Sequence, residues 1–66
     1  MRLDAFQIEL QMAEQELTQK RLAELCNVSA RNVSIIMRRG TCEPKTAGKL
    51  AKALGVPVEK IIRKEG

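Results

Sequence analysis

A chain of 66 residues forms at most one small domain, without room for both a hydrophobic core and a deep substrate cavity. Hydrophobic residues make up 44% and charged residues 30%, which excludes disorder, and the absence of His, Trp and Tyr removes the commonest general base, the commonest metal ligand and most aromatic stacking platforms. The net charge of +4 is uneven, −1 over residues 1–33 and +5 over residues 34–66, so a polyanionic partner is expected, with a merely solvated basic surface as the alternative.

The first predicted helix covers about residues 5–16. Asp4 is its expected N-cap, and Gln7 three residues later completes a capping box. Steps of three and four residues predict one core-facing apolar stripe, formed by Leu3, Phe6, Leu10, Ala13 and Leu17. Ile8 and Met12 fall outside this stripe, so they form either a staple with Leu3 or an exposed patch for a partner.

The second predicted helix covers about residues 19–26 and begins after Thr18, whose hydroxyl suits an N-cap. Four of its side chains are expected to face inward: Leu22, Ala23, Leu25 and Cys26. Asn27 should end the helix, because asparagine tolerates the left-handed backbone conformation better than any other residue except glycine.

The third predicted helix covers about residues 30–39, from the N-cap Ser29 to Gly40. Val28 and Val33 have the spacing of a hydrophobic staple. At 100° per residue, the core face comprises Val33, Ile36 and Met37. The opposite face comprises Arg31, Ile35 and Arg38.

Two more helices are predicted, over about 44–54 and about 58–63. Pro44 suits the first position of the longer one and Gly55 its C-terminal cap. Gly48 in its interior predicts close packing against another helix. The whole chain, residues 1–66, is thus expected to be one compact all-α domain of five helices.

The segment from Gln19 to Arg38 reads helix, tight turn, helix, which is the pattern of a helix-turn-helix. Its runs L-T-Q (17–19), V-S (28–29), V-S (33–34) and A-L-G-V (53–56) resemble the lambda-repressor-like, or XRE, regulators, and most closely the small single-domain ones of bacteria and mobile elements. The resemblance covers about residues 5–62, with the helix-turn-helix core at 18–39. Asn27 stands where the family usually has a turn glycine, and the third helix is one residue longer than is common.

The resemblance implies sequence-specific binding of double-stranded DNA and transcription regulation, with the helix at about 30–39 in the major groove. Arg31 is the best candidate base reader, because its planar fork matches guanine; a phosphate contact or a solvated side chain is the alternative. Asn32 could pair with adenine or help to cap its own helix. Ile35 could touch a thymine methyl or a neighbouring subunit, or lie half-buried in a rotated helix. The expected base-contacting set is Ser29, Ala30, Arg31, Asn32 and Ile35.

Backbone contacts are expected around the start of the second helix and the loop after the third. Gln19 lies where free N–H groups and the helix dipole favour a phosphate, and the resembled family contacts the backbone there. The expected set is Thr18, Gln19, Ser34, Arg38, Arg39, Thr41 and Lys45. Lys49 and Lys52 are expected to form a solvated face instead.

A homodimer is expected through one of two surfaces. One is the predicted helix at the C-terminal end, with Val58, Ile61 and Ile62, and the other is the Ile8/Met12 patch. Three rival functions stay open: a protein-interaction module on the same scaffold, a recombination or architectural accessory factor of a mobile element, and, least favoured, an enzyme.

Cys26 and Cys42 lack the spacing and histidine partners of a zinc site, and no signal peptide or membrane span is expected. We therefore predict reduced thiols in a cytoplasmic protein, with Cys26 in the core and Cys42 in an exposed loop, inert or, less expected, a redox switch. No catalytic residue, cofactor, metal, membrane or small-molecule substrate is expected.

Overall fold

The computed structural model describes residues 1–63, and its helices begin where the capping residues predict. The four α-helices are α1 (Ala5–Glu14), α2 (Gln19–Cys26), α3 (Ala30–Arg39) and α4 (Pro44–Leu54), followed by the 3₁₀ helix η1 (Val58–Lys60). The side chains of Asp4, Thr18 and Ser29 accept hydrogen bonds from backbone N–H groups three residues later, at 3.3, 3.1 and 3.0 Å. The bounds of α2, α3 and α4 confirm the sequence predictions.

Three helices end in the same left-handed turn. Positive φ angles occur at Glu16 (54°), Asn27 (59°) and Gly55 (72°). The N–H of the following residue in each case donates to a carbonyl five residues earlier, as in Leu17 to Met12 at 2.8 Å. The predicted end of α1 at residue 16 is therefore wrong, because the chain already turns back at Glu16.

The core-facing stripe predicted for α1 is wrong for its three helical residues, Phe6, Leu10 and Ala13, which are exposed, whereas Leu3 and Leu17 on either side of the helix do contact the core. Ile8 is fully buried and Met12 is 8% exposed, whereas Phe6 is 64% and Leu10 39% exposed. Both pairs, Ile8 with Met12 and Phe6 with Leu10, have helical spacing, so spacing does not decide which pair is buried. Tertiary contacts decide it, because Leu3, just before the helix, is held in place by a backbone hydrogen bond to Gly40. With Ile8 and Met12 in the core, the predicted docking patch on these two residues does not exist.

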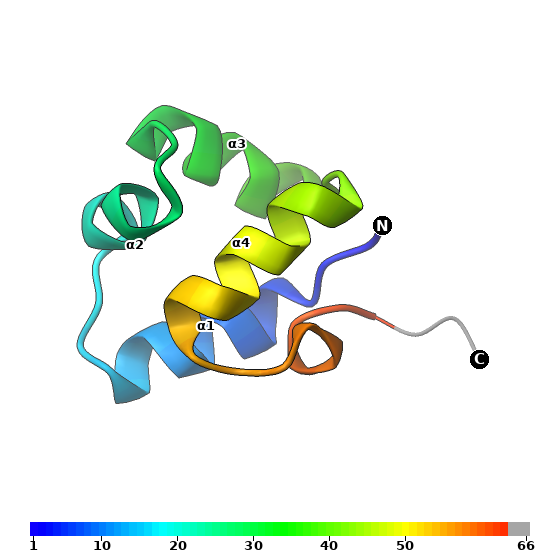
Figure 1. The fold of residues 1–66 in the computed structure, drawn as a ribbon, viewed down its shortest axis with the longest axis horizontal. Coiled ribbons are helices and arrows are strands. Elements are labelled where there is room, and N and C mark those ends of the chain that lie inside the picture. Colours follow the sequence, from blue (N-terminus) through cyan, green and yellow to red (C-terminus); the bar gives the residue numbers. More distant parts are fainter. Residues whose placement is uncertain (64–66) are drawn as a thin grey trace.

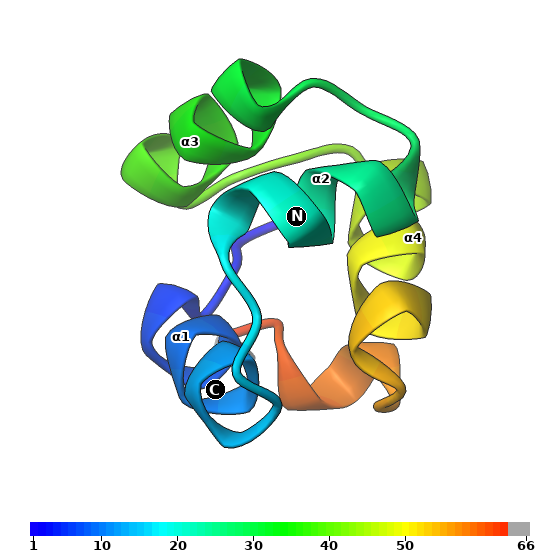
Figure 2. The same cartoon turned by 90° about the vertical axis from the view of Figure 1, so that its left-hand side faces the viewer.

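One hydrophobic core is shared by all the helical segments. Figure 2 shows α3 above α2, with α4 along one side and α1 at the base. The core contains buried side chains from the segment before α1, from all four α-helices and from the residue after η1. They are Leu3, Ile8, Met12, Leu22, Ala23, Cys26, Val33, Ile36, Ala47, Leu50, Ala51, Leu54 and Ile61. Leu25, predicted to face inward, is 46% exposed.

Short extended segments at both ends of the chain meet beside the α3–α4 loop, a feature that the sequence did not predict. Isolated antiparallel bridges join Arg2 with Thr41 and Leu3 with Ile62. The N–H of Leu3 donates to the carbonyl of Gly40, and that of Asp4 to Ile61, both at 2.8 Å. Figure 1 shows the first residues leading from the side of the molecule where α4 begins into α1. Since the N–H of Asp4 is taken by Ile61, the predicted capping box with Gln7 is only half formed.

Two predictions for the C-terminal half need correction. The fifth α-helix over 58–63 is a 3₁₀ turn of three residues, Val58–Lys60. Of the three residues in the predicted dimer surface, Ile61 is fully buried just after this turn, and Val58 and Ile62 are half-buried. Gly48 has no neighbour within 4 Å of the position that a Cβ would occupy, so close helix packing does not explain this glycine.

Candidate nucleic-acid interface

The α2–α3 turn holds α3 on the core by one face. Asn27 adopts the left-handed conformation at the end of α2, and Ser29 caps α3 two residues later. Val33 and Ile36 are buried, and Met37 packs against the core, as predicted. Val28 also packs against the core, consistent with the predicted staple. The core contacts of α3 therefore leave its opposite face exposed.

That opposite face carries Arg31, Ile35 and Arg38, all exposed. Ile35 is 40% exposed, and because Val33 and Ile36 are buried as predicted, the helix is not rotated away from the predicted orientation. Among residues 1–63 the ion pair found is Arg21 with Glu24, at 3.2 Å on α2, and neither Arg31 nor Arg38 takes part in one. Both guanidinium groups are thus available to an anionic partner.

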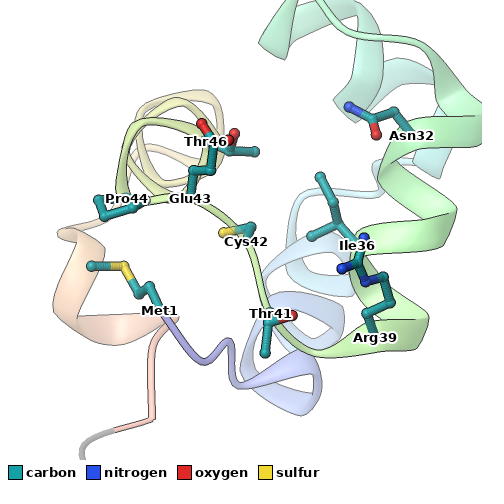
Figure 3. A pocket seen from close by; sticks show the side chains of 9 residues that line it. All are labelled: Met1, Asn32, Ile36, Arg39, Thr41, Cys42, Glu43, Pro44 and Thr46. Atoms are coloured by element: carbon teal, nitrogen blue, oxygen red, sulfur yellow. The ribbon is translucent and has the colours of Figure 1, made fainter.

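An open hollow of about 640 Å³ lies between α3 and the start of α4 (Figure 3). Asn32, Ile36 and Arg39 form its α3 side, and the Asn32 amide points across it toward Thr46. The remaining lining residues come from the N-terminus and the α3–α4 loop: Met1, Thr41, Cys42, Glu43, Pro44 and Thr46. Three predicted contact residues, Asn32, Arg39 and Thr41, are therefore brought together at one rim.

Two hydroxyl groups that were predicted to contact DNA already accept helix-capping hydrogen bonds. The Ser29 hydroxyl accepts from the N–H of Asn32 and the Thr18 hydroxyl from that of Arg21, so each retains its own O–H as a donor. Asn32 contributes its backbone N–H to this cap, and its side chain stays exposed. Of the other predicted contacts, one is half-buried, Ser34, and the rest are exposed: Gln19, Ala30, Thr41 and Lys45.

The comparison with known proteins settles the family. A helix-turn-helix family model matches residues 8–61, which is most of the chain. The chain belongs to the helix-turn-helix family, of the lambda-repressor-like type. It is a DNA-binding domain. Searches among curated proteins and among solved structures find no match.

This helix-turn-helix domain gathers further cations that sequence reasoning missed. A hollow of about 280 Å³ beside Gly40 is lined by Arg2 and Arg63, which sequence reasoning did not select, together with the predicted contact Arg39 and with Phe6. Arg2 and Arg63 are 61 residues apart in the sequence, and the N–H of Arg63 donates to the carbonyl of Arg2 at 3.0 Å. No local pattern predicts this juxtaposition, since it depends on the pairing of the two ends.

Both cysteines are protected thiols. Burial raises the pKa of Cys26, despite the opposing effect of Lys49, and the Cys26 Sγ lies 3.7 Å from the carbonyl oxygen of Lys49. Burial also raises the pKa of Cys42, with a smaller opposing effect of the terminal amino group. Cys42 is half-buried rather than exposed as predicted. A raised pKa disfavours the reactive thiolate, which argues against a redox switch.

Residues 1–63 contain no group of three or more metal-binding side chains. Within the same range, none of the helices has the length and apolar character needed to cross a membrane.

Proposed function

We propose that this helix-turn-helix protein binds specific sequences of double-stranded DNA and regulates transcription, with α3 in the major groove. The observation that carries the proposal is the exposed face of α3, where Arg31 and Arg38 flank Ile35 and pair with no described carboxylate. A helix presented in this way by a preceding helix and a tight turn is the geometry that delivers side chains to base edges.

The proposed base contacts are divided by chemistry. Arg31 binds guanine through its fork, Asn32 pairs with adenine, and Ile35 packs on a thymine methyl. Ser29 and Ala30 at the first turn allow close approach of the helix to the bases. The proposed backbone contacts are Thr18, Gln19, Ser34, Arg38, Arg39, Thr41 and Lys45.

The proposed role needs no reaction, cofactor or metal, and it places the protein in the cytoplasm, where bacterial DNA lies. Use of the same face as a protein-interaction module is disfavoured, because two exposed arginines, Arg31 and Arg38, flank its single apolar side chain, Ile35. A recombination accessory role keeps the same DNA contacts and differs only in what the bound site controls.

Selection of bound duplexes from a random DNA pool, at defined salt, tests the proposal. We expect one consensus sequence to be enriched. Arg31→Ala should lose about 1–3 kcal/mol of discrimination at one base pair and leave the other positions unchanged.

Lys45→Ala should weaken binding to all sequences alike and lower the slope of log K against log salt by about 1. Lys52→Ala, on the exposed side of α4 away from the proposed contacts, removes the same charge and is the matched control. Enrichment of no consensus by the wild-type protein, or equal effects of Arg31→Ala and Lys52→Ala at every position, would refute the proposal.

A further inference from the structure

The two ends of the chain form a basic hollow at the C-terminal end of α3. Its three arginines come from three segments: Arg2 precedes α1, Arg39 ends α3, and Arg63 follows η1. Among residues 1–63, no carboxylate lines the hollow, and neither Arg39 nor Arg63 takes part in an ion pair. The positive charge of these two guanidinium groups is therefore not neutralised within the described part of the chain.

Backbone hydrogen bonds hold the three segments beside one another. The N–H of Arg63 donates to the carbonyl of Arg2 at 3.0 Å, and the N–H of Leu3 donates to the carbonyl of Gly40 at 2.8 Å. An antiparallel bridge also joins Arg2 with Thr41. Because the backbone of Arg63 is already held beside the end of α3, less conformational entropy is lost when this site binds a ligand.

This hollow is continuous with the larger hollow between α3 and α4, where three of the proposed DNA contacts lie. Arg39 and Thr41 line both hollows. Figure 3 shows these two side chains at the end of the larger hollow away from Asn32. Arg39 is the last residue of α3, about 13 Å along the helix axis from Ala30. The basic hollow therefore lies beyond the bases that the first turn of α3 would contact.

We propose that Arg39 and Arg63 bind a backbone phosphate of the same DNA duplex, on the flank of the base pairs read by α3, with Phe6 against the adjoining deoxyribose. This inference rests on the proposed DNA binding. The planar guanidinium fork matches two phosphate oxygens. Phe6 lines the same hollow and is 64% exposed, so it offers apolar surface next to the charge.

An acidic protein segment is the alternative occupant of this hollow. Such a segment could pair with the same arginines, but it would have no reason to lie in line with the DNA-contacting face of α3. A DNA strand that passes Thr41 meets Arg39 and then the hollow lined by Arg63. The continuity of the two hollows therefore favours DNA.

The salt dependence of binding to the selected consensus duplex tests this contact. Arg63→Gln should lower the slope of log K against log salt by about 0.9 and the affinity by about eightfold at 0.1 M salt, with the consensus unchanged, because a phosphate contact carries no base information. Arg63→Lys keeps the charge and should retain the slope. Phe6→Ala should lower the affinity without changing the slope, since it removes no charge. Lys52→Gln, the matched control on α4 outside both hollows, should change neither quantity.

Uncharged methylphosphonates at single phosphates outside the consensus locate the contact. At one flanking position the substitution should weaken wild-type binding by about eightfold, and it should weaken binding of Arg63→Gln little further, because that variant has already lost the contact.

Three results would each overturn this contact while leaving the proposed DNA binding intact. They are an unchanged salt slope for Arg63→Gln, wild-type affinity for Phe6→Ala, and losses that multiply when Arg63→Gln is combined with every flanking methylphosphonate. Selection of no consensus by the wild-type chain would instead refute the proposed function itself. Far-UV circular dichroism of every variant establishes that it is folded.

Discussion

At the scale of single residues, the positions with a left-handed backbone conformation were the easiest to predict from the sequence, with one exception. Gly55 and Asn27 are the residue types that tolerate a positive φ, and both lie where the helices were predicted to end. Glu16 adopts the same conformation without that tolerance. Glutamate is a good helix former, so the sequence could not predict that α1 ends before it.

Asn27→Ala should lower the free energy of unfolding by about 1 kcal/mol, because alanine pays the steric cost of φ near 60° without the local compensation that asparagine has. Asn27→Gly is the control and should stay within about 0.5 kcal/mol of the wild type. Urea denaturation measures both. Equal stability of the alanine and glycine variants would show that the turn does not constrain this residue in solution.

The raised pKa values of the two thiols predict how the free energy of unfolding depends on pH. Because burial raises the pKa of Cys26 and Cys42 in the folded state, the stability they contribute is complete below the ordinary thiol pKa and is lost as pH rises through the folded values.

At pH 8.5, alkylation of Cys26 should therefore be slower in the native protein than in urea, by about tenfold or more, since reaction requires local opening. Mass spectrometry follows each cysteine separately, and the urea-unfolded chain is the control. Alkylation of native Cys26 at the unfolded rate would contradict its burial.

At the scale of elements, the helix starts were predictable because each depends on one side chain and a backbone group three residues away. The cap of α3 matters most, since it sets the first turn of the proposed DNA-contacting helix. Ser29 holds the N–H of Asn32 at 3.0 Å, and no other side chain caps that end among residues 1–63.

Ser29→Ala should cost about 1 kcal/mol of stability, the usual value for a lost N-cap. Ser29→Asp retains a capping oxygen and should keep the stability near that of the wild type, while its negative charge should weaken binding to DNA phosphates. Thermal unfolding and DNA titration separate the two effects. A Ser29→Ala variant as stable as the wild type would show that the cap is dispensable.

At the scale of the whole molecule, the two ends of the chain determine how α1 sits. Leu3 is held between Gly40 and Ile62, and Leu17 is turned back onto Met12. These anchors orient α1 so that Ile8 enters the core and Phe6 faces outward. The result is a core that contains Ile8 and Met12 and an outer face of α1 that exposes Phe6 and Leu10.

Ile8→Ala should lower the free energy of unfolding by about 2–5 kcal/mol, because it leaves a cavity at a fully buried site. Phe6→Ala removes a larger but mostly exposed side chain and should cost less than about 1 kcal/mol. Urea denaturation at low protein concentration, where copies are separate, measures both. The reverse order of effects would mean that α1 is rotated relative to the structure described here.

Much of the proposed interface was predictable, because the orientation of α3 follows from local signals that agree. Its cap, its end at Gly40 and the apolar spacing of Val33 and Ile36 all place Arg31 and Ile35 outward. The meeting of Arg2 and Arg63 with Arg39 was not predictable, since residues at opposite ends of the chain are joined only by tertiary pairing.

The sequence by itself determined where α2, α3 and α4 begin and end, and which family the chain resembles, because capping, left-handed turns and helical periodicity act over a few neighbouring residues. Only the tertiary structure decided which face of α1 is buried, that the last helix is a 3₁₀ turn, and that both ends pair beside the α3–α4 loop. Phe6–Leu10 and Ile8–Met12 have the same spacing, so periodicity cannot choose between them. The choice was made by long-range backbone hydrogen bonds, which no local pattern encodes.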